Sequence, residues 1–183
     1  MNIKKITFIG LGVMGYPMAG HLKNKAYEVT VYNRTSSKSK KWVDEFNGLS
    51  ADTPGKASNT SEVVFICVGR DYDLREVMEG ENGILNNVKE NTIIVDHTTA
   101  SANIAKEYYN ICKKKNLNFL DAPISGGQAG AENGALTVMI GGDEDAFKKA
   151  SPVIDSYSKK MKLLGPAGNG QLAKMVNQIC IAG

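Results

Sequence analysis

Three glycines near the start of the chain have a spacing that suits contact with a phosphate group. Gly10, Gly12 and Gly15 form the pattern G-x-G-x-x-G. The first glycine of such a pattern permits a tight turn, the second lets the main chain approach a diphosphate, and the third lets a helix pack closely. The N-terminus of the following helix offers free N–H groups and the positive end of its dipole. The pattern predicts a dinucleotide site built by Gly10, Leu11, Gly12, Val13, Met14 and Gly15.

A second polar run, Asn33-Arg34-Thr35, directly follows an apolar stretch at 28–32. Dinucleotide-binding folds often place a carboxylate here, which accepts hydrogen bonds from the ribose hydroxyls and repels a 2′-phosphate. Asn33 takes that place, while Arg34 can pair with a phosphate by charge and by its fork of donors. Thr35 adds a hydroxyl donor. We therefore predict NADP as the preferred cofactor, with NAD as the alternative. The competing interpretation is that Arg34 is merely a surface residue at a helix N-terminus, where a cation is mildly unfavourable.

A third candidate lies at Ser125-Gly126-Gly127, after an apolar stretch at 117–120. Two glycines behind a serine can expose backbone N–H groups as a nest for an anion such as a carboxylate. An ordinary turn with a serine cap explains the same residues equally well.

Lys174 and Asn177 are three positions apart in a helical pattern, so they share a helix face. A lysine beside an amide could donate a proton, although a lysine on a helix is usually a solvated charge. His97 titrates near neutrality, but the sequence shows no partner for it, so a structural role is favoured.

These residues need a scaffold that brings strand ends together. Apolar, β-branched stretches are separated by helical patterns, which predicts a doubly wound, mostly parallel α/β sheet. The expected strands are 6–9, 28–32, 63–68, 92–96, 117–120, 136–140 and 161–164. The expected helices are 16–25, 36–46, 71–78, 101–114, 143–158 and 171 onward. Ligands bind outside the carboxyl ends of strands in such sheets, which is where the candidate residues lie.

Composition narrows the class of protein. The chain has 183 residues, of which 42% are hydrophobic and 22% charged, with a net charge of +3. These values suit a globular domain and do not favour nucleic-acid binding. The three cysteines lack metal or redox spacing, and Cys67 is expected in the core. No signal peptide or long apolar span is evident, so we expect no membrane partner, no metal and a cytoplasmic location.

Three separate stretches resemble one family. Residues 10–19, 121–127 and 170–178 are similar to the β-hydroxyacid dehydrogenases, such as 3-hydroxyisobutyrate dehydrogenase and tartronate semialdehyde reductase. The resemblance runs through nearly the whole chain and implies a Rossmann fold. It also implies hydride transfer between NADP and a small 3-hydroxy acid or semialdehyde.

The resemblance assigns roles to single residues. Lys174 would be the general acid/base, and Asn177 would orient the substrate. Thr98 would lie beside the nicotinamide ribose. The substrate carboxylate would be held by Ser125, Gly126 and Gly127. Further cofactor contacts would come from Cys67, Val68 and Gly69, which replace the family's Met-Leu-Pro.

The family continues the lysine-bearing helix into an all-helical domain that closes the site and builds an oligomer. We expect residues 1–165 to form the cofactor domain and 166–183 the beginning of that helix, with the helical domain absent. Little or no turnover is then expected from this chain. A cofactor-binding module without turnover, or a relative of 6-phosphogluconate dehydrogenase or imine reductase, are the alternatives. A sugar-phosphate enzyme would need extra cations near Ser125, and none stands out.

Overall fold

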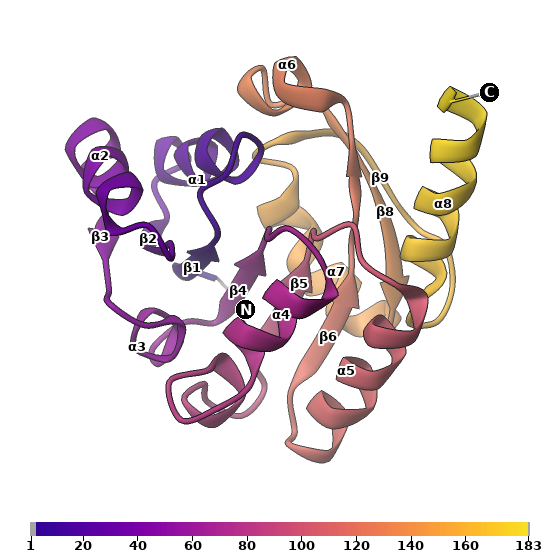
Figure 1. The fold of residues 1–183 in the computed structure, drawn as a ribbon, viewed down its shortest axis with the longest axis horizontal. Coiled ribbons are helices and arrows are strands. Elements are labelled where there is room, and N and C mark those ends of the chain that lie inside the picture. Colours follow the sequence, from indigo (N-terminus) through magenta and orange to yellow (C-terminus); the bar gives the residue numbers. More distant parts are fainter. Residues whose placement is uncertain (1–2, 183) are drawn as a thin grey trace.

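The parallel part of the sheet comes from short apolar stretches along the first two thirds of the chain. The structure is a computed structural model that describes residues 3–182 (Figure 1). Six strands lie parallel in the order β3-β2-β1-β4-β5-β6. They are β1 (Lys5–Ile9), β2 (Glu28–Tyr32), β3 (Leu49–Ser50), β4 (Val63–Ile66), β5 (Ile93–Asp96) and β6 (Asn118–Asp121). All residues of β4 and β5 are buried, as expected for strands covered on both faces.

The other side of the sheet is mixed. β8 (Leu136–Gly142) runs antiparallel to β6 and to β7 (Ile124–Ser125), and β9 (Ser158–Leu163) lies parallel to β8. Lysines are exposed along β9, and such charges protect an edge strand from pairing with another chain. The doubly wound, mostly parallel sheet predicted from the sequence is therefore confirmed.

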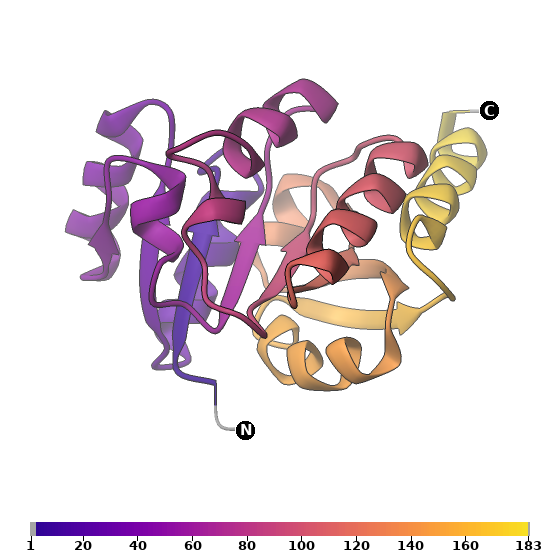
Figure 2. The same cartoon turned by 90° about the horizontal axis from the view of Figure 1, so that it is seen from below.

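Two hydrophobic cores fill the two faces of the sheet. One includes Phe8, Trp42 and Tyr157 and lies under α1 (Gly15–Asn24), α2 (Ser36–Phe46), α6 (Gly127–Glu132) and α7 (Glu144–Ile154). The other includes Tyr108 and Phe119 and lies under α3 (Pro54–Ser58), α4 (Asp71–Met78), the 3₁₀ turn η1 (Ile84–Asn86) and α5 (Ala102–Lys114). Figure 2 shows α5 and α7 on opposite faces.

The last helix, α8 (Asn169–Ala182), stands beside β8 and α5 at one end of the sheet (Figure 1). Its first turns are partly buried, whereas Val176, Ile179 and Ile181 are exposed. Packing therefore fixes the beginning of this helix, which carries Lys174, more firmly than its end.

Several predicted boundaries differ from the observed ones. The helix expected at 143–158 ends at Ile154, because buried Tyr157 holds a turn and its carbonyl accepts a hydrogen bond from Leu136 N. β9 consequently begins at Ser158, earlier than expected. Ser101 caps α5 by accepting a hydrogen bond from Ile104 N, so the helix expected at 101–114 begins at Ala102.

Candidate functional site

The glycine loop between β1 and α1 has the geometry that its spacing predicts. Gly10 has φ +96°, and a Cβ there would collide with the carbonyl oxygen of Cys67. A Cβ on Gly15 would collide with the carbonyl oxygen of Gly10, so the third glycine lets α1 pack against the loop. A Cβ on Gly12 would meet nothing within 4 Å. Gly12 therefore presents open main chain to a ligand, which fits the approach of a diphosphate.

The N-terminus of α1 is suited to an anion. No side chain caps the helix at Met14, and its first turn holds no acidic residue. Asn33 fixes the loop in place, because its Oδ1 accepts a hydrogen bond of 2.8 Å from Leu11 N and its Nδ2 donates to the carbonyl oxygen of Thr35. Gly10 N also donates to the carbonyl oxygen of Tyr32. The end of β2 therefore holds the glycine turn in its conformation.

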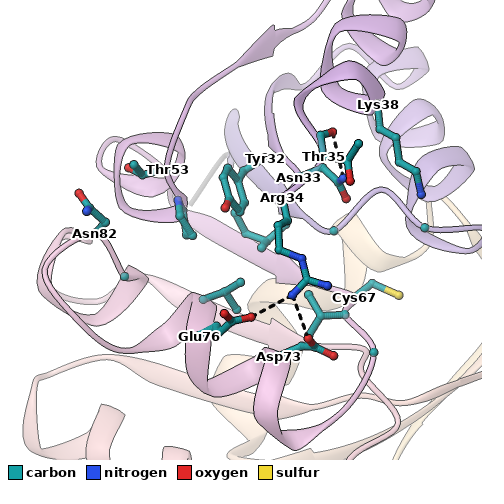
Figure 3. A pocket seen from close by; sticks show the side chains of 18 of the residues that line it. Tyr32, Asn33, Arg34, Thr35, Lys38, Thr53, Cys67, Asp73, Glu76 and Asn82 are labelled. Carbon is teal, nitrogen blue, oxygen red and sulfur yellow. Dashed lines mark hydrogen bonds and ion pairs between the residues drawn. The ribbon is translucent and has the colours of Figure 1, made fainter.

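A cavity of about 820 Å³ opens beside this loop (Figure 3). Of the predicted cofactor residues it is lined by Gly10, Gly12, Val13, Met14, Asn33, Arg34, Thr35, Cys67, Val68 and Gly69. Leu11 and Gly15 are buried and shape the turn from behind. Cys67 was expected in the core, but it follows β4 and is half-buried at the cavity wall, because β4 already ends at Ile66.

A second cavity of about 620 Å³ adjoins the first and is lined by three of the four predicted substrate residues, Ser125, Gly126 and Gly127. Lys174 lines it opposite Ser125, Gly126 and Gly127. Gly126 and Gly127 have φ values of +136° and +61°, a backbone that turns successive N–H groups to one side. Thr99, Gln178 and Ile181 also line the cavity. Nothing in the sequence pointed to Gln178 or Ile181, whereas Thr99 follows the strand expected at 92–96 and so emerges on the ligand side of the sheet.

Lys174 is buried although it carries an amine. Its side chain is only 7% exposed, and loss of solvent lowers its pKa from the ordinary 10.5. Asn177 does not line the cavity, but its Nδ2 donates a long hydrogen bond of 3.5 Å to Ser125 Oγ, which does. A lysine that gives up its proton more readily, beside an amide and a serine, can serve as a proton donor or acceptor.

A buried carboxylate positions α8. Asp121 Oδ1 accepts from Gly168 N at 2.7 Å, and Oδ2 accepts from Gln171 N at 2.9 Å. The Gln171 amide then accepts from Ala100 N and donates to the carbonyl oxygen of Thr98. These bonds join the first turn of α8 to the ends of β5 and β6, so they set the place of Lys174.

His97 is buried, and its ring contacts residues of the hydrophobic core. It is 1% exposed, stacks on Phe65, and bonds the carbonyl oxygen of Ala122 through Nδ1 and the hydroxyl of Tyr157 through Nε2. A carbonyl oxygen can only accept a hydrogen bond, so Nδ1 carries the ring proton. Nε2 then accepts a hydrogen bond from the hydroxyl of Tyr157. Burial lowers the pKa of His97 to about 4. His97 also lines the second cavity, but both of its ring nitrogens are already engaged by Ala122 and Tyr157.

The neighbours of His97 are also buried. Burial raises the pKa of Asp96 to about 7; its Oδ1 accepts from Thr98 N, while its Oδ2 has no partner within residues 3–182. Thr98 is 1% exposed, and its hydroxyl accepts from Val68 N. Thr98 thus supports the 67–69 loop from behind, whereas exposed Thr99 reaches the cavity.

Comparison with known proteins agrees with this geometry. A family described as the NAD binding domain of 6-phosphogluconate dehydrogenase matches residues 5–165. The chain belongs to this family. An uncharacterised oxidoreductase of Shewanella frigidimarina is 58% identical, over 98% of this chain and 62% of its own length. The 2-hydroxy-3-oxopropionate reductase of Escherichia coli is 34% identical, over 97% of this chain and 60% of its own length.

A solved structure extends the likeness to the fold. The 3-hydroxyisobutyrate dehydrogenase of Mycobacterium tuberculosis, described with L-serine, superposes with a TM-score of 0.92 at 28% identity. The match covers 99% of this chain and 61% of that protein. The resemblance to the β-hydroxyacid dehydrogenases is confirmed, and the chain spans about three fifths of such relatives. It is an NAD(P)-binding domain.

Two further findings on this NAD(P)-binding domain concern metal ions and membranes. Within residues 3–182, no three His, Cys, Asp or Glu side chains are grouped so that they could hold a metal ion. In the same part of the chain, no helix has the length and apolar character needed to cross a bilayer.

Proposed function

We propose that the domain binds NADP at the glycine loop and serves a dehydrogenase or reductase that acts on a small 3-hydroxy acid or semialdehyde. One observation carries the proposal: the two cavities share a wall. Met14, Cys67, Val68 and Gly69 line both the cavity beside the glycine loop and the cavity that contains Lys174. A cofactor held by the first cavity would therefore face a substrate held by the second.

The division of labour follows from the residues. The nicotinamide, when bound, supplies or accepts the hydride. The N–H groups of Gly126 and Gly127, with the Ser125 hydroxyl, hold the carboxylate of the substrate.

Lys174 acts at the hydroxyl end of the substrate. Lys174 Nζ takes the hydroxyl proton during oxidation and returns it to the oxygen during reduction. Asn177, which donates a hydrogen bond to Ser125 Oγ, orients the substrate. The low exposure of Lys174 lowers its pKa, so the side chain loses its proton to form the neutral amine more readily. A substrate of this class is in keeping with the relative that is described with L-serine, itself a 3-hydroxy acid.

The preference for NADP rests on the residues after β2. Arg34, Thr35 and Lys38 line the same side of the first cavity, where α2 begins without a side-chain cap. Two cations and a helix N-terminus favour a phosphate there. NAD remains the alternative, because a ribose hydroxyl also fits beside Asn33 and Thr35.

A binding test separates this function from a plain structural turn. NADPH fluorescence is titrated with the wild-type chain and with Gly12→Ala. Because a Cβ at Gly12 meets no atom within 4 Å, the variant is expected to fold, while its methyl group occupies the approach of the diphosphate. We expect the affinity to fall at least about tenfold, a contact loss of about 1.4 kcal/mol. Equal binding by both proteins would refute the site.

A turnover test addresses the chemistry. The chain is assayed with NADPH and a panel of semialdehydes, beside a longer protein in which this domain continues as it does in its relatives. We expect this chain to bind NADPH without measurable turnover, and the longer protein to turn over. Lys174→Met in the longer protein should remove turnover and leave the NADPH affinity within twofold. Turnover retained by Lys174→Met would refute the assignment of the proton carrier.

A further inference from the structure

Arg34 does not stand alone at the cavity mouth. Its Nη1 donates to Glu76 Oε2 at 3.1 Å and to Asp73 Oδ1 at 3.4 Å, as the dashed lines in Figure 3 show. Asp73 and Glu76 are three positions apart on α4 and so lie on one face of that helix. Arg70 Nε lies 3.9 Å from Asp73 Oδ2. The guanidinium thus bridges the end of β2 to α4.

Arg34, Asp73 and Glu76 all border the first cavity. Its α2 side carries the cations Arg34 and Lys38, and its α4 side carries the carboxylates of Asp73 and Glu76. Asp73 is 20% exposed and is held by two arginines, whereas Glu76 is 44% exposed. The cation that suits a 2′-phosphate is therefore already neutralised by two acids.

We infer that Asp73 and Glu76 are cofactor-specificity residues that weaken the preference for NADP over NAD, an inference that rests on the proposed function. A phosphate carries a charge of about −1.5 to −2 at neutral pH. To reach Arg34 Nη1 it must replace the carboxylates or bind beside them against like charge. A ribose hydroxyl has no charge and meets neither obstacle. The acidic pair therefore acts on NADP and much less on NAD.

The size of the effect follows from the exposure of the pairs. An exposed ion pair changes an equilibrium by a factor of about 1.5 to 5. Arg34 is 76% exposed, so screening limits each pair to that range. Removal of both carboxylates should therefore tighten NADPH binding by about threefold to tenfold and change NADH binding by less than about twofold.

The test measures the ratio of the two dissociation constants, Kd for NADH over Kd for NADPH. Titrations use the wild type, Asp73→Asn, Glu76→Gln and the double variant, with folding checked by thermal melts. Asp52→Asn is the matched control, since it removes one exposed carboxylate next to Thr53 and Pro54, which line the cavity. We expect the ratio to rise about threefold to tenfold in the double variant, and to stay within twofold of wild type in Asp52→Asn.

A second background shows whether Arg34 mediates the effect. In Arg34→Ala, we expect the two α4 substitutions to leave the ratio within about twofold, because the competed cation is gone. An unchanged ratio in the double variant would overturn the inference, and so would the same shift in Asp52→Asn or in the Arg34→Ala background. Weaker NADH binding by the double variant would also overturn it, because the acids would then be ribose-binding groups. If the double variant does not fold, the single variants decide. Wild type that binds neither nucleotide refutes the proposed function itself.

Discussion

The neighbours Asp96 and His97 should have opposite effects on stability as the pH changes. Both are fully buried, and burial drives each towards its neutral form. The pKa of Asp96 rises from the ordinary 3.8 to about 7, so the folded protein keeps a proton that the unfolded chain releases. Stability contributed by neutral Asp96 is therefore present below pH 4 and lost as the pH rises towards 7.

His97 has the opposite sign. Its pKa falls from the ordinary 6.5 to about 4, so the unfolded chain takes up a proton that the folded protein refuses. Its stability is present above pH 6.5 and is lost as the pH falls towards 4. At about 1.36 kcal/mol per pKa unit, the effect is about 4 kcal/mol for Asp96 and about 3 kcal/mol for His97. Together they largely cancel between pH 4 and pH 7.

When Asp96 or His97 is substituted, the pH dependence contributed by the other residue should become measurable. Relative to wild type, Asp96→Asn should gain about 4 kcal/mol of unfolding free energy between pH 4 and pH 8, because the buried charge is gone. His97→Gln should gain about 3 kcal/mol, relative to wild type, as the pH falls from 7 to 4.

Urea unfolding, followed by the fluorescence of buried Trp42, measures both changes at constant ionic strength. The exposed Asp145→Asn is the control and should follow wild type at every pH. Curves for Asp96→Asn and His97→Gln that run parallel to wild type from pH 4 to pH 8 would show that these two groups are not held neutral by burial.

Three other predictions concern the elements around the site. Asp121→Asn keeps one acceptor and loses one charge-assisted hydrogen bond to the start of α8, so unfolding free energy should drop by about 2 kcal/mol. Hydrogen exchange should quicken in α8 before it does in β4, and unchanged protection of α8 would argue against this anchor. Gly15→Ala should destabilise the domain by about 2 kcal/mol, because its Cβ would collide with the Gly10 carbonyl oxygen. A thermal melt unchanged from wild type would refute that packing. An NMR titration of Lys174 Cε should give a midpoint below the ordinary 10.5, since burial disfavours the ammonium. A midpoint at or above that value would show a solvated side chain.

Local patterns sufficed for the sheet and the glycine loop. Helix 36–46 was predicted with its observed bounds, because apolar spacing and a polar start are encoded within the helix itself. The turn at Gly10 and the open main chain at Gly12 also follow from residue type. Contacts between segments that are distant in the sequence could not be predicted from these local patterns. Asp121 lies 50 positions from Gln171, and His97 lies 60 positions from Tyr157.

The same limit explains what the site analysis missed. Nothing in the run at 33–35 indicates that Arg34 meets carboxylates about 40 positions later on α4. Lys174 could not be told from a solvated lysine by spacing alone, since its burial depends on where α8 is anchored. Residue type and the family resemblance named the candidate groups, and the tertiary structure shows how exposed each one is and which charges surround it.

The wall between the two cavities has a kinetic consequence. The short loop at 67–69, braced by the Thr98 hydroxyl, belongs to both chambers. A nicotinamide lying along this loop would form part of the surface of the second cavity that a hydroxy acid contacts. Addition should then be ordered, with the dinucleotide arriving first and leaving last, and a hydroxy acid should bind poorly to the protein without it.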